Sequence, residues 1–464
     1  MYEGYFGDRR LSRRADQFVN AIGQHETVVV NRLSSDWSEQ MAYYRFLDNE
    51  EVTLEELQSG LTRRCGDLSG GGHKLVIQDT SQFNFQHHSG RIKPESGLGV
   101  IGDNESLGFF FHPSLVIDAD SGYGVGFSDI QIWTRPADSL DKHDRDYKNL
   151  PIEEKESYRW ISSVENSREV LSDADRLTVI ADRESDIFEL FAQLPDDRTD
   201  LLIRCCQNRK IVEGGGKLFE YLASRPCAGI YEIEVKKDLR KSRRGRIAHM
   251  EVRYCQLTLL CPDKLSGLGI AEKVSIYAIE AKEIASSVPD GEEAIHWRLL
   301  TTHQIESFAE AVECLQWYSL RWLLEQLFRL LKLKGFNLEE SELQRGSSLI
   351  KLCVLTLAAA LDVMRLMLAR SGEQKQPIAH VFTAEEQTCL IELAPTLEGR
   401  TQKQQNPHSK QTLAWASWII ARLGGWNGYQ SQHPPGPITF YRGLKQFETF
   451  SQGWKLARKL MYNP

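Results

Sequence analysis

Short apolar runs separated by polar turns fill the middle of the chain and predict strands. Lys74–Gln78 and Leu177–Ala181 are short, mainly apolar runs, which is typical of buried strands, and they end at Asp79 and Asp182. Tyr123–Trp133 alternates at period two, which predicts a strand with two different faces. Further strands are expected at Phe109–Asp118, Leu201–Cys205, Gly229–Val235, Glu251–Leu260, Val274–Ala281 and Trp297–Thr301.

Helical periodicity dominates both ends of the chain. Residues 1–66 are expected to form helices, and an amphipathic helix is expected at Ser157–Val170. One long helix is expected over residues 307–334, within a pattern that stays helical to about Ser371. Two helical segments follow, around Leu413–Leu423 and Tyr441–Lys459.

The order of these elements predicts a mixed α/β fold. It is the order of a ribonuclease-H-like core with a β-sheet insertion, which is one of several mixed α/β options. We expect a helical domain at residues 1–68, a core at 69–371 with the insertion at about 201–300, and a helical region at 372–464.

Composition narrows the class of protein. A chain of 464 residues predicts two or three domains, and its net charge of −8 does not by itself suggest a nucleic-acid partner. The nine cysteines show no zinc-site spacing and suit a reducing cytoplasm. The start of the chain lacks the apolar stretch of a signal peptide, and the apolar segment Leu349–Leu368 contains charges that favour a buried helix over a membrane span.

Three carboxylates are candidates for metal-dependent chemistry at phosphodiesters. Asp79 and Asp182 each follow a strand, where open α/β sheets place their ligands, and Glu325 lies on the long predicted helix. Two divalent metals held by such carboxylates suit phosphodiester cleavage. An aspartate after a strand is more often a turn former or a helix cap, and a lone helical glutamate is more often a solvated side chain.

The spacing around Glu325 strengthens this hypothesis. Tyr318, Arg321, Glu325 and Lys332 are separated by three, four and seven residues, which places all four on one face of a helix. Cationic groups one turn from a metal-binding carboxylate suit the phosphates that flank a scissile bond. By spacing alone, a solvated salt-bridged face is equally consistent with the pattern.

The pattern Tyr318-x2-Arg321-x3-Glu325-x6-Lys332 resembles the signature of bacterial DDE cut-and-paste transposases of the insertion-sequence-four family, and the chain looks most like their Tn-five-type members. The similarity covers essentially the whole chain, in the family's order. The other similar segments are Phe6–Arg10, Ala42–Leu47, Ile77–Thr80, Trp133–Pro136, Asp182–Ile187, Trp297–Thr301 and Ile420–Gly425.

The resemblance implies a role for each position. Asp79, Asp182 and Glu325 would bind two Mg²⁺ ions, for which Mn²⁺ can substitute. Phosphate contacts are implied for Tyr318, Arg321 and Lys332. Trp297 would stack in the DNA while a base is flipped out, although on sequence alone a core tryptophan is favoured. Arg209 would contact DNA from the insertion.

The implied partners are double-stranded DNA, both as element ends and as target, and a second copy of the chain. The implied reaction cleaves the ends through a hairpin and joins the 3′ ends to target DNA, in the bacterial nucleoid and without a membrane. Two basic clusters fit this interpretation. The first is Arg9, Arg10, Arg13 and Arg14, with two pairs at i,i+4 spacing, and the second is Lys236–Arg246.

Two other functions remain compatible with the sequence. A ribonuclease-H-like nuclease or junction resolvase would use the same carboxylates without end binding or strand transfer. A DNA-binding regulator derived from a transposase would bind the ends without cleaving them, although the three carboxylates argue against lost catalysis.

Overall fold

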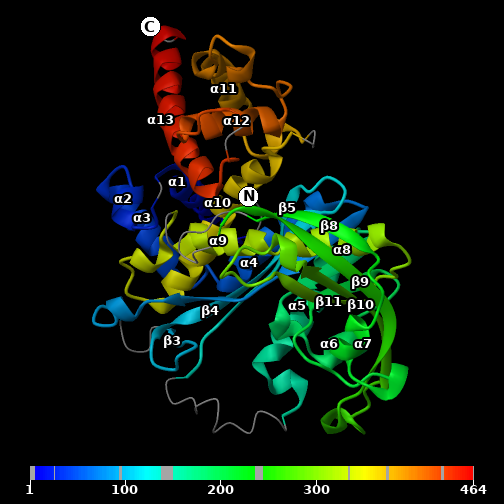
Figure 1. Cartoon of the computed structure of the whole chain (residues 1–464). Helices are drawn as coiled ribbons and strands as arrows, with labels where there is room; N and C mark the ends of the chain where they lie inside the picture. Colours follow the sequence, from blue (N-terminus) through cyan, green and yellow to red (C-terminus); the bar gives the residue numbers. More distant parts are fainter. Residues whose placement is uncertain are drawn as a thin grey trace. The chain divides into compact units, whose positions relative to one another are not determined.

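The chain forms two compact units in the computed structural model (Figure 1). Unit 1 comprises Met1–Ser69, Thr80–Asp141 and Leu323–Pro464, and unit 2 comprises Gly70–Asp79 and Lys142–Trp322. The structure describes residues 6–25, 27–92, 97–136, 150–235, 244–332, 335–372, 376–429 and 433–462.

Unit 2 is built on a mixed sheet with the strand order β1-β6-β7-β11-β10-β9-β8. β1, β6 and β7 are parallel, and the remaining neighbours pair antiparallel. The strands are β1 (His73–Gln78), β6 (Arg176–Ala181), β7 (Thr199–Arg204), β8 (Gly229–Val235), β9 (Arg246–Leu260), β10 (Lys273–Glu283) and β11 (His296–Thr301).

Burial along these strands explains their sequence patterns. β1 and β6 are buried at every position after the first, as expected of strands covered on both faces, so most of their residues are apolar. β8 alternates between half-buried and exposed positions, because one face of this edge strand is accessible to water.

The described residues of unit 2 also form four α-helices, and α8 carries one of the candidate site residues, Tyr318. α8 begins after Ser307, whose hydroxyl accepts from the backbone N–H of Glu310 in a capping box. It packs against β6 and β9, while α6 and α7 contact β10. The helices are α5 (Arg159–Val170), α6 (Phe188–Gln193), α7 (Leu218–Ala223) and α8 (Phe308–Ser319).

The prediction of one long helix over residues 307–334 is wrong. α8 ends at Ser319, and α9 (Trp322–Lys332) begins three residues later. The backbone N–H groups of Leu320 and Arg321 bond to the carbonyls three residues back, which is a tighter turn than an α-helix. The Ser319 hydroxyl donates to the carbonyl of Gln316 and competes for the helix ladder at this point.

Unit 1 is mainly helical, with a small antiparallel group of strands in which β2, β3 and β5 each pair with β4. The strands are β2 (Ser81–Asn84), β3 (Gly99–Val100), β4 (Leu107–Asp118) and β5 (Gly124–Trp133). The helices besides α9 are α1 (Arg9–His25), α2 (Val30–Leu33), α3 (Trp37–Asp48), α4 (Leu54–Ser69), α10 (Gly346–Ala369), α11 (Ala384–Leu397), α12 (Leu413–Leu423) and α13 (Pro437–Tyr462).

The apolar helix α10 forms the centre of unit 1. It contacts α1, α3 and α4 from the N-terminal part and α12 and α13 from the C-terminal part, so both ends of the chain share one core. α10 is the one described helix that is long and apolar enough to cross a membrane, and 89% of its most apolar window is buried. This confirms the expectation of a buried helix at Leu349–Leu368.

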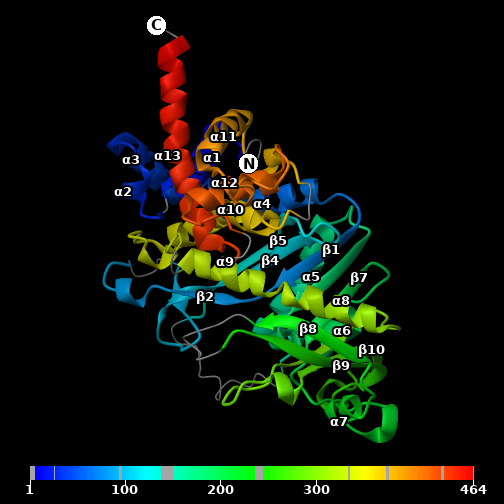
Figure 2. The same cartoon turned by 45° about the horizontal axis from the view of Figure 1, so that its top comes forward.

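The mixed α/β fold class is confirmed, with a mixed sheet and helical flanks. The predicted helical segment 1–68 matches four helices that end at Ser69. Helices from both ends of the chain pack on α10, so unit 1 combines three separate segments of the sequence. The division into three consecutive domains stays a prediction. Figure 2 shows α13 projecting past α11 and α12, its neighbours in unit 1.

Candidate active site

Asp79 and Asp182 are brought together by strand pairing. β1 and β6 pair in parallel, with Ile77 opposite Ile180. The same register, carried two residues further, places Asp79 opposite Asp182. Neighbouring strands are about 5 Å apart, so two carboxylates from different parts of the chain share one edge of the unit 2 sheet.

Asp182 has an oxygen available for a ligand. Its backbone carbonyl accepts from the N–H and the hydroxyl of Ser185, which anchors the short turn Arg183–Ser185. The side-chain Oδ1 is buried and accepts no hydrogen bond from the described residues. A buried acceptor without a donor is unfavourable by about 1–3 kcal/mol, and such an atom in a native fold suggests an additional partner.

The neighbouring Asp186 has a structural role instead. It is fully buried, and its carboxylate accepts from the backbone N–H groups of Cys206 and Gln207 and forms a 2.6 Å ion pair with Arg209. Arg209 is 8% exposed and also donates to the Asp186 carbonyl. This pair ties the turn after β6 to the segment after β7, and the DNA contact of Arg209 stays a prediction.

Asp79 is paired with a cation of the predicted signature. Arg321 lies in the turn that follows α8, and its Nη1 donates to Asp79 Oδ2 at 2.6 Å. The side chains are 15% and 18% exposed, so the pair is partly shielded from water. The tight turn at Leu320–Arg321 therefore brings a guanidinium to the strand-end carboxylates.

Tyr318 and Trp297 lie next to each other in unit 2. Tyr318, on α8, is buried, and burial raises the pKa of its phenol. The charges of Arg321 and Asp182 also act on that phenol. Trp297, on β11, is half-buried and meets the Tyr318 ring edge to face, with centroids 6.2 Å apart. Trp297 is therefore neither a core tryptophan nor a fully exposed one.

Glu325 and Lys332 belong to α9 in unit 1. Glu325 is exposed on a helix whose other face is buried. Lys332 donates from Nζ to the hydroxyl of Ser81 at 2.7 Å and lies 5.2 Å from the centre of the Phe83 ring. Burial lowers the pKa of Lys332.

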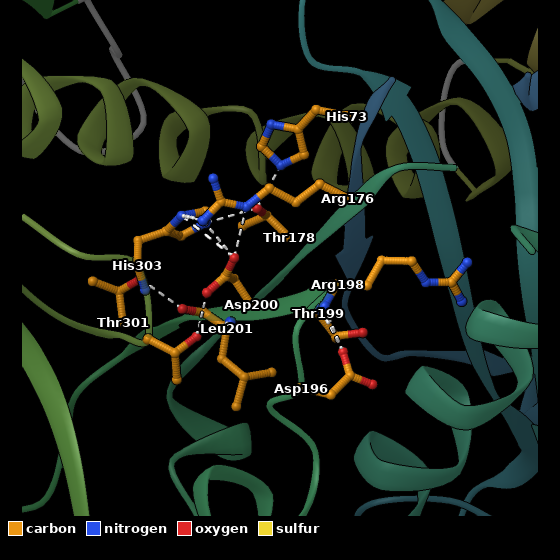
Figure 3. Close-up of polar contacts among 11 residues, drawn as sticks. His73, Arg176, Thr178, Asp196, Arg198, Thr199, Asp200, Leu201, Thr301 and His303 are labelled. Carbon is orange, nitrogen blue, oxygen red and sulfur yellow. Dashed lines mark hydrogen bonds and ion pairs between the residues drawn. The ribbon is translucent and has the colours of Figure 1, made fainter. Parts of the chain in front are cut away.

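The opposite ends of β1 and β6 carry a closed polar network (Figure 3). The Thr178 hydroxyl lies 2.7 Å from Nε2 of both His73 and His303. Arg176 donates to His303 Nδ1 and to Asp200, whose other oxygen accepts from a threonine hydroxyl. Burial lowers the pKa of His303 to about 4, with the positive charges of Arg176 and His73 acting in the same direction.

This network supports α8. The indole of Trp317, one residue before Tyr318, contacts the rings of His73 and His303, with centroids 5.0 and 5.2 Å apart. Periodicity and motifs do not predict the network, because its members come from four separate segments. The one available signal was polar Thr178 within an otherwise apolar strand.

The donor set at the strand ends fits a hard divalent cation, because it consists of carboxylate oxygens and one of them has no protein donor among the described residues. Within the described ranges, no group of three or more His, Cys, Asp or Glu side chains is arranged to hold a metal ion. The structure thus brings together Asp79 and Asp182, with Arg321 and Tyr318 in the same unit, while Glu325 belongs to unit 1.

The N-terminal arginines form an exposed basic surface. Arg9, Arg10 and Arg13 are exposed at the start of α1, and Arg14 stacks on the Tyr43 ring at 5.9 Å. The first turn of α1 contains no acidic residue. Positive charge at a helix N-terminus is unfavourable to the helix dipole, so this cluster does not serve the stability of α1 and suits an anionic partner.

The second basic cluster falls largely outside the described residues, which exclude 236–243. Its last member, Arg246, is held in unit 2 by Glu283 and Glu292 at 2.7 and 2.6 Å. The strands on either side pair as a hairpin, with Val235 opposite Arg246. The role of the segment stays a prediction.

The comparison with known families bears on the N-terminal segment. Residues 3–52 match the family described as Transposase DNA-binding. The matched range contains α1, α2 and α3 together with the four arginines. The match supports a transposase that binds DNA.

Proposed function

We propose that the protein is a DDE-type DNA transposase that binds element ends, cleaves them and joins the 3′ ends to target DNA. The observation that carries the proposal is the in-register pair Asp79 and Asp182, with Arg321 bonded to one of them. The DNA-binding match at residues 3–52 supports the same class of enzyme. The Tyr318–Lys332 signature supports the insertion-sequence-four family.

The proposed metal ligands are Asp79, Asp182 and Glu325. Two Mg²⁺ or Mn²⁺ ions at these carboxylates would supply an activated water or hydroxyl and stabilise the leaving oxygen. Asp182 contributes a buried oxygen without a donor among the described residues, and Asp79 contributes a carboxylate that Arg321 neutralises. Glu325 enters from the sequence signature and from its exposure on α9.

The remaining signature residues would hold DNA. Arg321 bonds to the Asp79 carboxylate, and it would bind a DNA phosphate in its place if that carboxylate held a metal ion. The buried phenol of Tyr318 keeps its proton and can donate to a phosphate oxygen. The Trp297 ring packs on Tyr318 and offers a face for an unpaired base, which is the arrangement that a hairpin intermediate needs.

We also propose a ribonuclease-H-like core, because Asp79 and Asp182 follow two parallel strands of the unit 2 sheet. The proposal also includes a homodimer formed through α13. Four apolar side chains of α13 are more than half exposed, which is unusual for a helix without a partner. They are Phe450, Leu456, Leu460 and Met461.

The decisive experiment uses a labelled duplex that carries the inverted repeats found beside the coding region. Wild type is expected to bind it, to cleave it with Mg²⁺ and to join it to a target plasmid. Glu325→Ala should bind with unchanged affinity and lose all cleavage, because binding uses the N-terminal arginines. Glu184→Ala, which changes an exposed carboxylate two residues from Asp182, should cleave normally.

The outcomes separate the proposed enzyme from its rivals. Cleavage of any sequence without joining would indicate a nuclease, and binding without any cleavage by wild type would indicate a regulator. Cleavage that survives Glu325→Ala would show that another carboxylate completes the site.

A further inference from the structure

Unit 1 contains a large cavity whose described lining residues all belong to that unit. It has a volume of about 1260 Å³ and lies among the end of α10, the segment before α12, α12 itself (orange in Figure 1) and the segment after it. Typical small-molecule sites have volumes of about 300–1,000 Å³, so this cavity has room for a ligand of nucleotide size or larger.

The described part of the cavity lining is basic. Arg370 and Lys403 contribute positive charge to it, burial lowers the pKa of the lining residue His408, and no aspartate or glutamate is among the described residues that line it. The chain as a whole carries more acidic than basic residues, so a basic lining with no carboxylate among its described residues is not a consequence of composition. Such a surface selects for an anion.

Arg370 is the strongest single indication. It is half-buried, and its guanidinium donates to the backbone carbonyl of Pro435 at 2.6 Å. No carboxylate pairs with it within the described part of the chain, and burial lowers its pKa. A partly desolvated guanidinium is normally matched by a carboxylate or a phosphate, so an anionic ligand would complete its environment.

The aromatic part of the lining adds donors and flat surfaces. Trp418, Trp426 and Tyr429 line the cavity, and Trp418 is 4% exposed. The indole N–H groups of Trp418 and Trp426 are buried and find no acceptor among the described residues. Cζ2 of Trp418, on the same edge of the ring as its N–H, faces Gly428, another lining residue. A ligand rich in acceptors would satisfy both groups.

We propose that this cavity binds an unpaired nucleotide, with its phosphate at Arg370 and Lys403 and its base against the indole rings. Anionic oxygens match the cations, base carbonyls and ring nitrogens match the indole donors, and base stacking on aromatic rings is largely independent of sequence. The binding site goes beyond the proposed transposase chemistry and does not depend on Asp79, Asp182 or Glu325. The nucleotide belongs to a single DNA strand or is free in solution.

The test is photo-crosslinking of the full-length protein to a short single-stranded oligothymidylate that contains 5-iododeoxyuridine, with mass spectrometry of the resulting peptides. Crosslinks to Trp418, Trp426 or Tyr429 are expected. Competition by thymidine monophosphate would identify a free nucleotide as sufficient, and competition by unlabelled oligonucleotide alone would identify a DNA strand. Inorganic phosphate should compete far more weakly than either.

Variants make the assignment specific. Arg370→Gln should reduce these crosslinks about tenfold, as loss of a charge-assisted contact predicts, and Lys403→Gln about threefold. Lys403 is exposed, so its substitution leaves folding intact and carries the test if Arg370→Gln does not fold. Lys410→Gln removes an exposed charge that does not line the cavity, and it should have no effect.

Three results would overturn the proposal. Crosslinks confined to other segments, such as α1, would show that the nucleotide binds elsewhere. Equal losses in Lys403→Gln and Lys410→Gln would show a nonspecific charge effect. Equal competition by inorganic phosphate would show that the base is not recognised. Because crosslinks are mapped by residue, inactivity of the strand-end carboxylates would not affect the readout.

Discussion

The two ends of β1 and β6 carry polar groups of opposite character. At the N-terminal end, His73, Thr178 and His303 satisfy one another's hydrogen bonds. At the C-terminal end, Asp182 keeps a buried oxygen without a donor among the described residues, and Asp79 is matched by an arginine. A satisfied network favours one structure, whereas an unsatisfied group marks a position where a ligand would bind.

Two carboxylates that follow β6 also differ in whether their hydrogen bonds are satisfied. Asp182 and Asp186 are four residues apart in the same motif. Asp186 is bonded to two backbone N–H groups and to Arg209, while Oδ1 of Asp182 has no bond to the described residues. Position after a strand thus does not distinguish the structural Asp186 from Asp182, the proposed metal ligand, but the state of their hydrogen bonds does.

The largest expected effect comes from substituting one polar residue at each end of β1 and β6. Asp182 is changed at the C-terminal end and Thr178 at the N-terminal end. Asp182→Asn should reduce cleavage at least about a thousandfold, or about 4 kcal/mol of transition-state stabilisation, because a metal ligand is lost. Its free energy of unfolding should be unchanged or higher. Thr178→Val should keep the cleavage rate and lose about 1–3 kcal/mol of stability, because two buried imidazoles lose a partner. Cleavage kinetics and urea unfolding measure the two effects. Lost cleavage in Thr178→Val together with lost stability in Asp182→Asn would contradict the roles given to the two ends.

Asp186→Asn tests whether the second carboxylate of the motif is structural. The substitution leaves Arg209 buried without its counter-charge, so a loss of about 3–5 kcal/mol in unfolding free energy is expected. Glu184→Gln, which breaks an ion pair with a 65% exposed carboxylate, should change stability by less than about 1 kcal/mol. Similar values for the two variants in urea denaturation would argue against a structural role for Asp186.

The network at the other end predicts a pH dependence of stability. The pKa of His303 is lowered from 6.5 to about 4 in the folded chain, so the unfolded chain gains a proton first as pH falls. Stability from this group is complete above about pH 6.5 and is lost as pH falls toward 4. Between pH 7 and 4.5 the loss should be about 2–3 kcal/mol, measured as the difference between wild type and His303→Gln. Parallel pH profiles for the two proteins would contradict this origin.

Metal binding gives the smallest expected effect. Mg²⁺ at about five times its dissociation constant should stabilise wild type by about 1 kcal/mol, visible as a higher midpoint of thermal unfolding. Thr178→Val should retain the increase and Asp182→Asn should lose it. An increase that persists in Asp182→Asn would place the metal elsewhere.

The strands of the unit 2 sheet could be predicted from the sequence because each strand buries a local apolar run. Leu177–Ala181 lies within β6, and Gly229–Val235 coincides with β8. The positions of Asp79 and Asp182 could also be predicted, because each aspartate comes directly after one of these runs. The sequence also placed Leu413–Leu423 as a helix, because its apolar positions recur at helical spacing.

Long-range hydrogen bonds were not predictable in this way. The partners Thr178 and His303 are 125 residues apart, and the pair Arg209 and Asp186 is invisible to any periodicity. The break between α8 and α9 was missed because no glycine or proline marks it, and only a serine hydroxyl and two shortened backbone bonds interrupt the helix. The resemblance placed Arg209 at DNA, while the structure shows its guanidinium in a buried ion pair.

The strand register that joins Asp79 to Asp182 has a consequence for how the chain can change over time. Their proximity depends on two neighbouring strands and not on the length of chain between them. Doubling such a connection adds only about 0.6 kcal/mol of closure entropy. Insertions between the two strands, whether acquired in evolution or made to carry a targeting module, should therefore leave the spacing of the two carboxylates intact.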